Sequence, residues 1–238
     1  MEQTLQNAVL TKAEKTKQGL IALFTEQGFL FSVDEETFFS FGLEKAIKNS
    51  SPLSGGELAL LLSKSEQAHA KQAALRLVAG RIFARQELYK KLCQKYEARA
   101  AAWAIAELER LGYLNDEAYA RARAAALLRK NRSKTVILRD LAEKGIDRET
   151  ALAVLEELWE EQGEQSGNAA AIANLLQRQY ARKLQQGKVQ QVQAALARRG
   201  FSFGEIRDGI RQWQQENPQT EEFEDIEDRI GEYECDLL

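Results

Sequence analysis

The chain contains the stretch Ser133-Lys-Thr-Val-Ile-Leu-Arg-Asp-Leu-Ala-Glu-Lys-Gly-Ile-Asp147. Ile137 and Leu141 are four residues apart, which places both side chains on one face of a helix. Ser133 is of a type that caps helix N-termini, and Gly145 is of the type that ends helices in the left-handed conformation. The stretch therefore predicts a short amphipathic helix between Ser133 and Gly145.

The same pattern occurs three times along the chain, at separations of 49 and 55 residues. Gly200 ends the last copy as Gly145 ends the second, whereas Tyr96 stands near that place in the first. A further helix follows each copy. The matching residues are Leu88, Leu92 and Leu108; Ile137, Leu141 and Leu158; and Val192, Leu196 and Trp213. A helical unit repeated about every 50 residues predicts a modular array.

The first 65 residues follow a different pattern. Leu20 to Thr25 and Phe29 to Val33 are short apolar runs separated by Glu-Gln-Gly, which predicts a β-hairpin. Ser54 and Glu57 have capping-box spacing before a short apolar segment, and Ser63 and Glu66 have the same spacing before a second helix. The fold class is therefore mainly α with a small N-terminal hairpin.

Only two prolines occur, Pro52 and Pro218, so the 165 residues between them can be helical throughout. We divide the chain into an N-terminal extension with a hairpin at 1–65, three-helix repeats at 66–114, 115–163 and 164–215, and an acidic tail at 216–238.

Composition excludes several classes of protein. The longest apolar run, from Ala100 to Ala106, is far shorter than the roughly 20 residues of a membrane helix, and no secretory signal is visible. Two cysteines, Cys93 and Cys235, cannot build a disulfide framework and fit a reducing, cytoplasmic compartment. The lone histidine, His69, and these cysteines are too scattered for a zinc site, so no metal and no cofactor are expected.

The charge is distributed unevenly. The whole chain has 33 basic and 36 acidic residues, but residues 216–238 alone contain ten acidic residues and one basic residue. The tail therefore has a net charge of −9 and the remainder one of +6. We expect the acidic stretch from Glu221 to Asp228 to be disordered, or else to dock on the chain's own basic face or on a basic partner.

Basic residues gather around the second helix of each unit, Arg129 and Arg199 among them. Apolar residues at spacing four face the core, so Lys90, Lys91 and Arg139 should point outward. A repeated basic surface suits an anionic polymer or a protein filament, although solvation of helices explains any single residue equally well. The residues predicted to contact a partner are Arg85, Lys90, Lys91, Arg132, Lys134, Arg139, Arg178, Arg182, Lys183, Lys188 and Arg198.

No catalytic constellation is evident in the sequence. His69 is expected to be an ordinary helix residue, exposed or half-buried. Cys93 is expected to be a small packing residue, since no nearby histidine could activate it.

The stretches Leu111-Gly-Tyr-Leu-Asn-Asp-Glu-Ala-Tyr-Ala-Arg121 and Asn131 to Asp147 resemble the RecX family of recombination regulators. The family pattern is Leu-Asp-Asp-x-x-Phe/Tyr-Ala followed by Leu-x-x-Lys-Gly-Ile. Ala195 to Phe203 is similar to the C-terminal signature of the family, and the region from Phe29 to Leu43 is similar to the hairpin of its longer members. Departures are Asn115, where the family often has Asp, and the acidic tail.

The resemblance implies three tandem three-helix units in an elongated, curved array. It also implies a protein that binds the RecA recombinase or its nucleoprotein filament and modulates, usually inhibits, recombination and the SOS response. We expect the chain to be a monomer and, from the absence of a catalytic constellation, not an enzyme. DNA is a further implied contact, and a membrane is not.

Two other functions stay open at this point. Three-helix units resemble helix-turn-helix architecture, so a direct DNA-binding module is an alternative. A protein scaffold is the other, with Trp103, Trp159 and Trp213 as anchors, although these residues fit a repeat core better.

Overall fold

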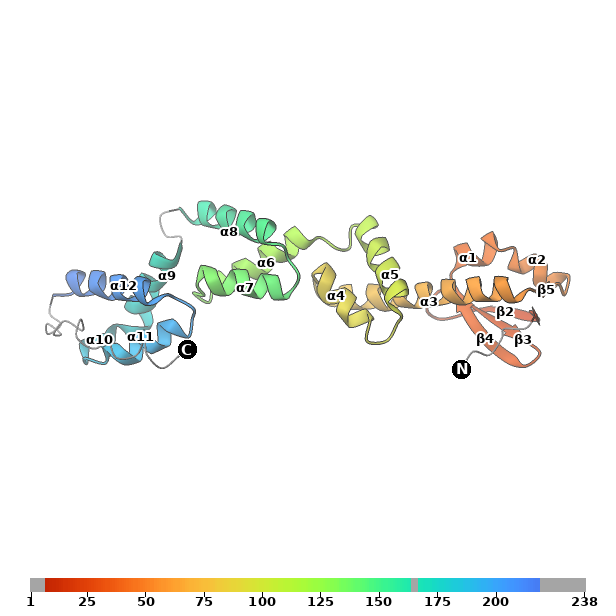
Figure 1. The fold of residues 1–238 in the computed structure, drawn as a ribbon, viewed down its shortest axis with the longest axis horizontal. Coiled ribbons are helices and arrows are strands. Elements are labelled where there is room, and N and C mark those ends of the chain that lie inside the picture. Colours follow the sequence, from red (N-terminus) through yellow and green to blue (C-terminus); the bar gives the residue numbers. More distant parts are fainter. Residues whose placement is uncertain (1–6, 164–166, 219–238) are drawn as a thin grey trace, which may run out of the picture. The chain divides into compact units, whose positions relative to one another are not determined.

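The computed structural model describes residues 7–163 and 167–218, and it divides into two compact units. Unit 1 comprises Met1–Tyr119 with Lys144–Ile146, and unit 2 comprises Ala120–Glu143 with Asp147–Leu238. Figure 1 shows that both units are built mainly from helices and that strands occur in the N-terminal part of unit 1. The mainly α fold with a small hairpin is thus confirmed.

A three-stranded antiparallel sheet of order β2-β3-β4 lies in unit 1. β3 (Ile21–Thr25) and β4 (Gly28–Val33) form the predicted hairpin, in which Thr25 pairs with Gly28. The sequence pattern did not predict β2 (Lys12–Lys15), which pairs with β3. It also missed the short β1–β5 pair, Ala8–Val9 with Pro52–Leu53.

Three helices pack with this sheet: α1 (Glu35–Ser40), α2 (Leu43–Lys48) and α3 (Gly55–Val78). Their shared core includes Leu23, Leu43 and Leu61, none of which is exposed to solvent. Because two strands alone are marginal in water, this helical cover stabilises the hairpin.

The capping box of Ser54 and Glu57 opens α3 as predicted. The second start predicted at Ser63 is wrong, because α3 continues without a break to Val78. A serine inside a helix does not end it when the residues on either side pack well, and Ser65 is itself buried. The helix also passes through the expected division at residue 65, so that division and the others stay predictions.

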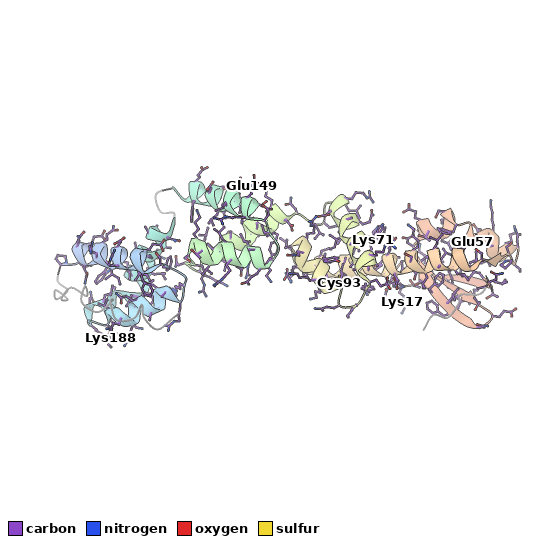
Figure 2. The ribbon with its side chains drawn as sticks, viewed as in Figure 1. Lys17, Glu57, Lys71, Cys93, Glu149 and Lys188 are labelled. Carbon is purple, nitrogen blue, oxygen red and sulfur yellow. The ribbon has the colours of Figure 1, made fainter. Side chains whose placement is uncertain are left out.

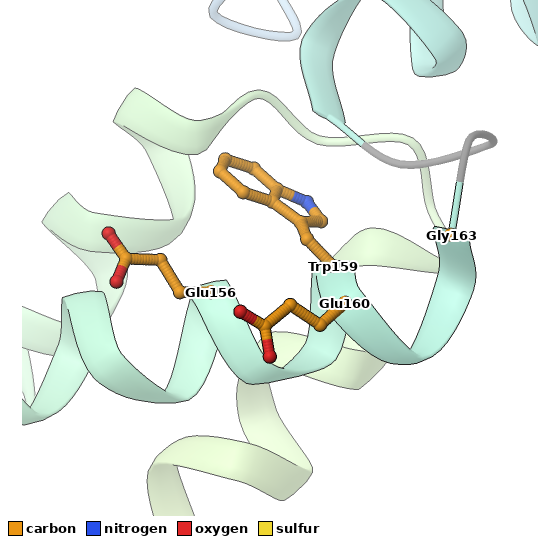
Figure 3. A pocket seen from close by; sticks show the side chains of 4 residues that line it. All are labelled: Glu156, Trp159, Glu160 and Gly163. Carbon is orange, nitrogen blue, oxygen red and sulfur yellow. The ribbon is translucent and has the colours of Figure 1, made fainter.

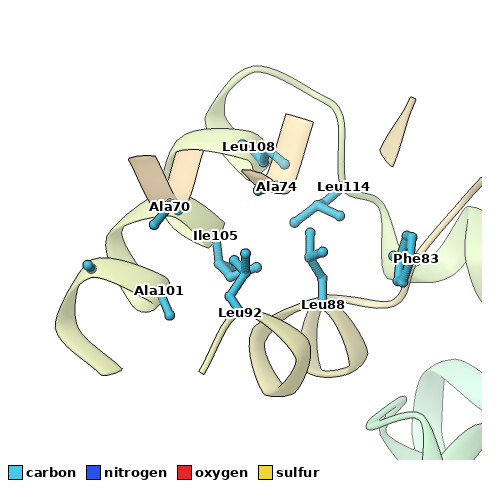
Figure 4. Packing of buried hydrophobic residues seen from close by; sticks show 11 residues of the cluster. Ala70, Ala74, Phe83, Leu88, Leu92, Ala101, Ile105, Leu108 and Leu114 are labelled. Carbon is cyan, nitrogen blue, oxygen red and sulfur yellow. The ribbon is translucent and has the colours of Figure 1, made fainter. Parts of the chain in front are cut away.

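The remaining helices of unit 1 are α4 (Arg85–Leu92) and α5 (Ala98–Arg110). They pack against the second half of α3 in one apolar cluster (Figure 4). Small residues of α3 and α5, including Ala70, Ala74 and Ala101, let these helices approach closely while Leu88 and Leu108 fill the space between them.

α6 (Asp116–Leu128) begins in unit 1 and continues into unit 2. Asn115 accepts a hydrogen bond from the Ala118 N–H at 2.9 Å and so performs the capping role that the family pattern gives to an aspartate. Asp116 is then available to receive the Arg85 N–H at 2.7 Å.

Unit 2 contains six further α-helices in its described part: α7 (Lys134–Glu143), α8 (Arg148–Gln162), α9 (Gly167–Leu175), α10 (Ala181–Gln185), α11 (Val189–Ala197) and α12 (Phe203–Glu216). The π-helical turn η2 (Leu176–Tyr180) joins α9 to α10. Residues 167–185 therefore form one continuous helical segment with a π turn inside it.

The repeat predicted from the sequence is confirmed in the pattern of burial. Leu88, Ile137 and Val192 are all fully buried. The residues four positions later, Leu92, Leu141 and Leu196, are at most 2% exposed. Leu108, Leu158 and Trp213 of the third helices are buried as well. The acidic tail from residue 219 onward lies outside the described residues.

The two turns that follow α7 and α11 lie against the start of an earlier helix, and we call them the glycine turns. In unit 1 the turn Lys144–Ile146 packs on α4, where a Cβ on Gly145 would come within 2.4 Å of Gln86 Cβ. In unit 2 a Cβ on Gly200 would come within 2.2 Å of Val136 Cγ2 on α7. Both glycines have positive φ, +87° and +90°. Neither the backbone conformation nor the space admits another residue.

Within each unit, a side chain from later in the sequence bonds to the start of the same helix. The Arg85 N–H at the start of α4 donates to Asp116 Oδ1 at 2.7 Å, and the Lys134 N–H at the start of α7 donates to Asn168 Oδ1 at 2.9 Å. Asn168 Nδ2 in turn donates to Glu205 Oε1 at 2.7 Å. Glu205 also accepts from Ser202 in the capping box of α12.

We predict that Gly200→Ala lowers the free energy of unfolding by about 3 kcal/mol, the sum of left-handed strain and overpacking against Val136. Urea denaturation of the full chain measures this change. Gly204→Ala is the matched control, because a Cβ there meets nothing within 4 Å and its φ is not positive, so its stability should stay within about 1 kcal/mol. Equal effects of both substitutions would contradict the close packing.

A second prediction concerns pH. Partial burial raises the pKa of Glu205, but hydrogen bonds from Asn168 and Ser202 lower it by more. The pKa therefore lies below its ordinary value of 4.5. The carboxylate therefore stabilises the fold above pH 4.5, and this contribution disappears as the pH falls through the lowered pKa. Glu205→Ala should cost about 1 kcal/mol at pH 7 and progressively less in acid. Glu156→Ala serves as the control, because Glu156 is exposed on α8 and forms no ion pair with another described residue. A loss that does not vary with pH would refute this role for the charge.

Candidate basic interaction surface

The side chains predicted to contact a partner are mostly exposed. Arg132 and Lys134 are half-buried at the start of α7, and Lys188 lies at the solvent-facing start of α11 (Figure 2). The other exposed members are Arg85, Lys90, Lys91, Arg139, Arg178, Arg182, Lys183 and Arg198. The prediction that Lys90, Lys91 and Arg139 point outward is thus confirmed.

These residues differ from other cations of the chain in their ion pairs. Among the described residues, Arg85 is the one member of the set that meets a carboxylate, Glu109, at 3.4 Å. By contrast, Arg123 pairs with Asp140 at 2.7 Å and Lys144 pairs with Glu87 at 3.1 Å. These pairs use the cation inside the fold, whereas the predicted contact residues other than Arg85 keep their charge for solvent or a partner.

Unit 2 brings several of these cations together. Arg132 Nη1 lies 3.5 Å from the Arg198 carbonyl oxygen, and Arg199 Nη2 donates to Gln179 Oε1 at 3.1 Å. Lys183 and Arg199 lie 6.0 and 5.8 Å from the centre of the Tyr180 ring. Arg129 and Arg178 line one cavity. We call this group the C-terminal basic cluster: Arg129, Arg132, Arg178, Lys183, Arg198 and Arg199.

Arg129 and Arg199 are absent from the residues selected on sequence alone. Both lie in basic runs that the sequence shows, but helical spacing does not reveal that the end of α6, the π turn and the end of α11 meet. No described contact joins Arg139, Arg182 or Lys188 to the cluster.

Unit 1 carries a smaller basic surface on α4. The Arg81 guanidinium lies 3.5 Å from the centre of the Phe83 ring, and Lys91 Nζ lies 5.8 Å from it. Glu87 accepts hydrogen bonds from Arg81 and Lys144. Burial raises the pKa of Glu87, but these bonds lower it by more. The carboxylate therefore stays ionised and neutralises both cations.

The reactive side chains have structural surroundings. His69 Nε2 lies 2.9 Å from Ser32 Oγ, and this contact ties α3 to β4. Burial and the nearby Arg76 lower the pKa of His69, so its imidazole is neutral at pH 7. Cys93 is exposed at the C-terminal end of α4, so the expectation that it packs in the interior is wrong. Its neighbour Leu92 occupies the core position instead.

The described residues contain no cluster of three or more His, Cys, Asp or Glu side chains that could hold a metal ion. In the same part of the chain, no helix has both the length and the apolar character needed to cross a membrane.

The three tryptophans have different surroundings. Trp213 is buried in the core of unit 2, and Trp103 packs against the core of unit 1. Both therefore fit the core interpretation. Trp159 lines a shallow cavity of about 420 Å³ on α8 together with Glu156 and Glu160 (Figure 3). Lys134 Nζ lies 5.2 Å from the centre of its ring, so one face of the indole already has a cationic neighbour.

Comparison with known proteins gives consistent matches. Residues 115–155 match the family model described as RecX, second three-helix domain. A regulatory protein RecX of Lactobacillus delbrueckii subsp. bulgaricus is 30% identical over 208 residues, which is 86% of this chain and 74% of the relative. A regulatory protein RecX of Caldanaerobacter subterraneus subsp. tengcongensis is 25% identical over 147 residues, 61% of this chain and 73% of the relative.

Solved structures agree on the fold. A crystal structure of regulatory protein RecX superposes with a TM-score of 0.64 at 21% identity and covers 86% of this chain and 99% of its own. RecX from Lactobacillus salivarius gives a TM-score of 0.52 at 21% identity and covers 63% of this chain and 97% of its own. From the extent and identity of the sequence matches, this chain belongs to the RecX family of regulatory proteins.

Proposed function

We propose that this chain is a non-enzymatic regulator that binds the RecA recombinase or its nucleoprotein filament and inhibits recombination, ATP hydrolysis and the SOS coprotease activity. The name regulatory protein RecX, carried by its relatives, supports a regulatory role. The specific partner follows from the resemblance of the repeated helical motifs to that family. We further propose that the protein acts as a monomer in the cytoplasm.

The observation that carries the proposal is the C-terminal basic cluster. Its guanidinium and ammonium groups come from three separate segments of unit 2, and none of the six meets a carboxylate within the described residues. A nucleoprotein filament presents phosphates and charged protein side chains over a long surface. Arginines suit such a surface because the planar guanidinium binds carboxylate and phosphate in a bidentate manner.

Binding alone is sufficient for the proposed inhibition. A protein that occupies a filament surface blocks subunit addition or strand access without forming a covalent bond. The rigid helical units hold the cations in place, which limits the entropy lost on binding.

Direct binding to naked DNA is the alternative function. The same unneutralised arginines favour it, because phosphate contacts supply much of the affinity of any DNA-binding protein. The two functions differ in the need for recombinase. Binding to naked DNA weakens steeply with salt, whereas a protein interface on the filament retains affinity when DNA contacts are screened.

The test is DNA-dependent ATP hydrolysis and strand exchange by the cognate recombinase, with and without this protein. We predict inhibition at stoichiometric levels. The double variant Lys183→Gln, Arg198→Gln removes two exposed members of the cluster. It should need about fivefold more protein for equal inhibition, since two exposed charge contacts of about 0.5 kcal/mol each sum to about 1 kcal/mol.

Arg148→Gln is the matched control, because Arg148 is exposed in the first turn of α8 and lies outside the C-terminal basic cluster. It should inhibit as well as the unmodified chain. Absence of inhibition together with absence of filament binding would refute the proposed function. Equal weakening by the control would show that net charge acts instead of this surface.

A further inference from the structure

A cavity of about 480 Å³ opens within unit 2 beside the C-terminal basic cluster. The end of α6 and the turn after it contribute Arg129 and Asn131, and α9 with η2 contributes Asn174, Arg178 and Gln179. Residues from the segments 128–131 and 167–179 thus line one cavity. Its volume lies in the range of small-molecule sites.

The charged side chains that line the cavity are all cationic. It contains two guanidinium groups and three carboxamides, and no carboxylate lines the cavity. Neither Arg129 nor Arg178 forms an ion pair within the described residues, so their charges are not neutralised by the fold. Such a lining favours an anion and disfavours a cation or an apolar molecule.

Two unusual backbone conformations flank the cavity. Asn131 is one of two non-glycine residues with positive φ in the described chain, at +50°. The other flank is the π turn Leu176–Tyr180, which carries Arg178 and Gln179. π turns inside α-helices and left-handed non-glycine residues are uncommon, cost free energy and concentrate at functional sites. Their meeting at one cavity indicates a binding site.

A third arginine fixes the orientation of the Gln179 amide. Arg199 Nη2 donates to Gln179 Oε1 at 3.1 Å, so the acceptor end of the amide faces Arg199 and its Nε2 hydrogens remain available for a ligand. Arg199 Nη1 is buried with no hydrogen-bond partner in the described residues. Arg199 does not line the cavity itself, and its bond to Gln179 holds that amide at the cavity wall.

We propose that this cavity binds a nucleoside 5′-phosphate, with the phosphate on Arg129 and Arg178 and the base edge on the Asn174 and Asn131 carboxamides. Bidentate arginine contacts suit the phosphate, and carboxamides bind adenine in a bidentate manner. The ligand is either a free nucleotide or one unit of a single strand. The site shares Arg129 and Arg178 with the C-terminal basic cluster, and nucleotide binding is therefore tested without recombinase.

The test uses fluorescence anisotropy of the full chain with a labelled oligodeoxyadenylate, and competition with adenosine 5′-monophosphate, adenosine or inorganic phosphate. The double variant Arg129→Gln, Arg178→Gln should lose at least tenfold in affinity. It should also lower the slope of log affinity against log salt by about 1.4, the value for two phosphate contacts on a single strand. Asn174→Ala should lower affinity about fivefold with an unchanged slope, because it removes a base contact of about 1 kcal/mol.

Arg211→Gln is the matched control, since Arg211 is an exposed arginine on α12 that does not line the cavity. Thermal unfolding checks that each variant folds. Displacement by the monophosphate but not by adenosine supports a free-nucleotide site, and oligonucleotide binding that the monophosphate does not displace supports a strand site. Unchanged affinity in the double variant, or an equal loss in Arg211→Gln, overturns the proposal.

Filament inhibition by the same variants separates this proposal from the proposed function. Retained inhibition with lost nucleotide binding leaves both proposals standing. If the double variant loses inhibition but still binds nucleotide, the cavity is not a nucleotide site, and Arg129 and Arg178 belong to the filament contact.

Discussion

Two glycines without room for a β-carbon hold the repeated helices together. Gly145 and Gly200 both adopt a left-handed backbone, and each places a turn directly against the first turn of an earlier helix. This approach brings Asp116 within 2.7 Å of the Arg85 N–H and allows the Ser133 N–H to reach the Arg199 carbonyl oxygen. Without it both N–H groups would lose their protein partners, and that of the buried Ser133 would be left unsatisfied, which costs free energy.

The charge of the molecule is divided between two kinds of cation. Some serve the fold, such as Lys144, whose ion pair with Glu87 secures a glycine turn. Others, such as Arg178 and Arg198, meet no carboxylate in the described chain. Because the paired cations are neutralised by their carboxylates, the positive electrostatic potential at the surface comes from the unpaired cations. A chain with a net charge of −3 thus presents distinct positive surfaces.

The sequence predicted the features that depend on local periodicity. The helix carrying Ile137 and Leu141, the capping box at Ser54 and the hairpin before Val33 were all predicted correctly, because each depends on neighbours within a few residues. The candidate site was predicted only in part. Arg129 and Arg178 line the same cavity although they are far apart in the sequence, and the π turn itself has no recognised sequence signal. Long-range contacts of this kind are not encoded in helical spacing.

Asn168 and Asp116 occupy matching places in the two glycine-turn contacts but differ by one functional group. Asn168 accepts from the Lys134 N–H and donates to the Glu205 carboxylate, which needs an amide. An aspartate there would face Glu205 with a second negative charge, whereas Asp116 has no such neighbour among the described contacts. The repeats therefore cannot replace one another at this contact. A chain assembled by exchanging its own repeats would keep the helices but lose the connection between them.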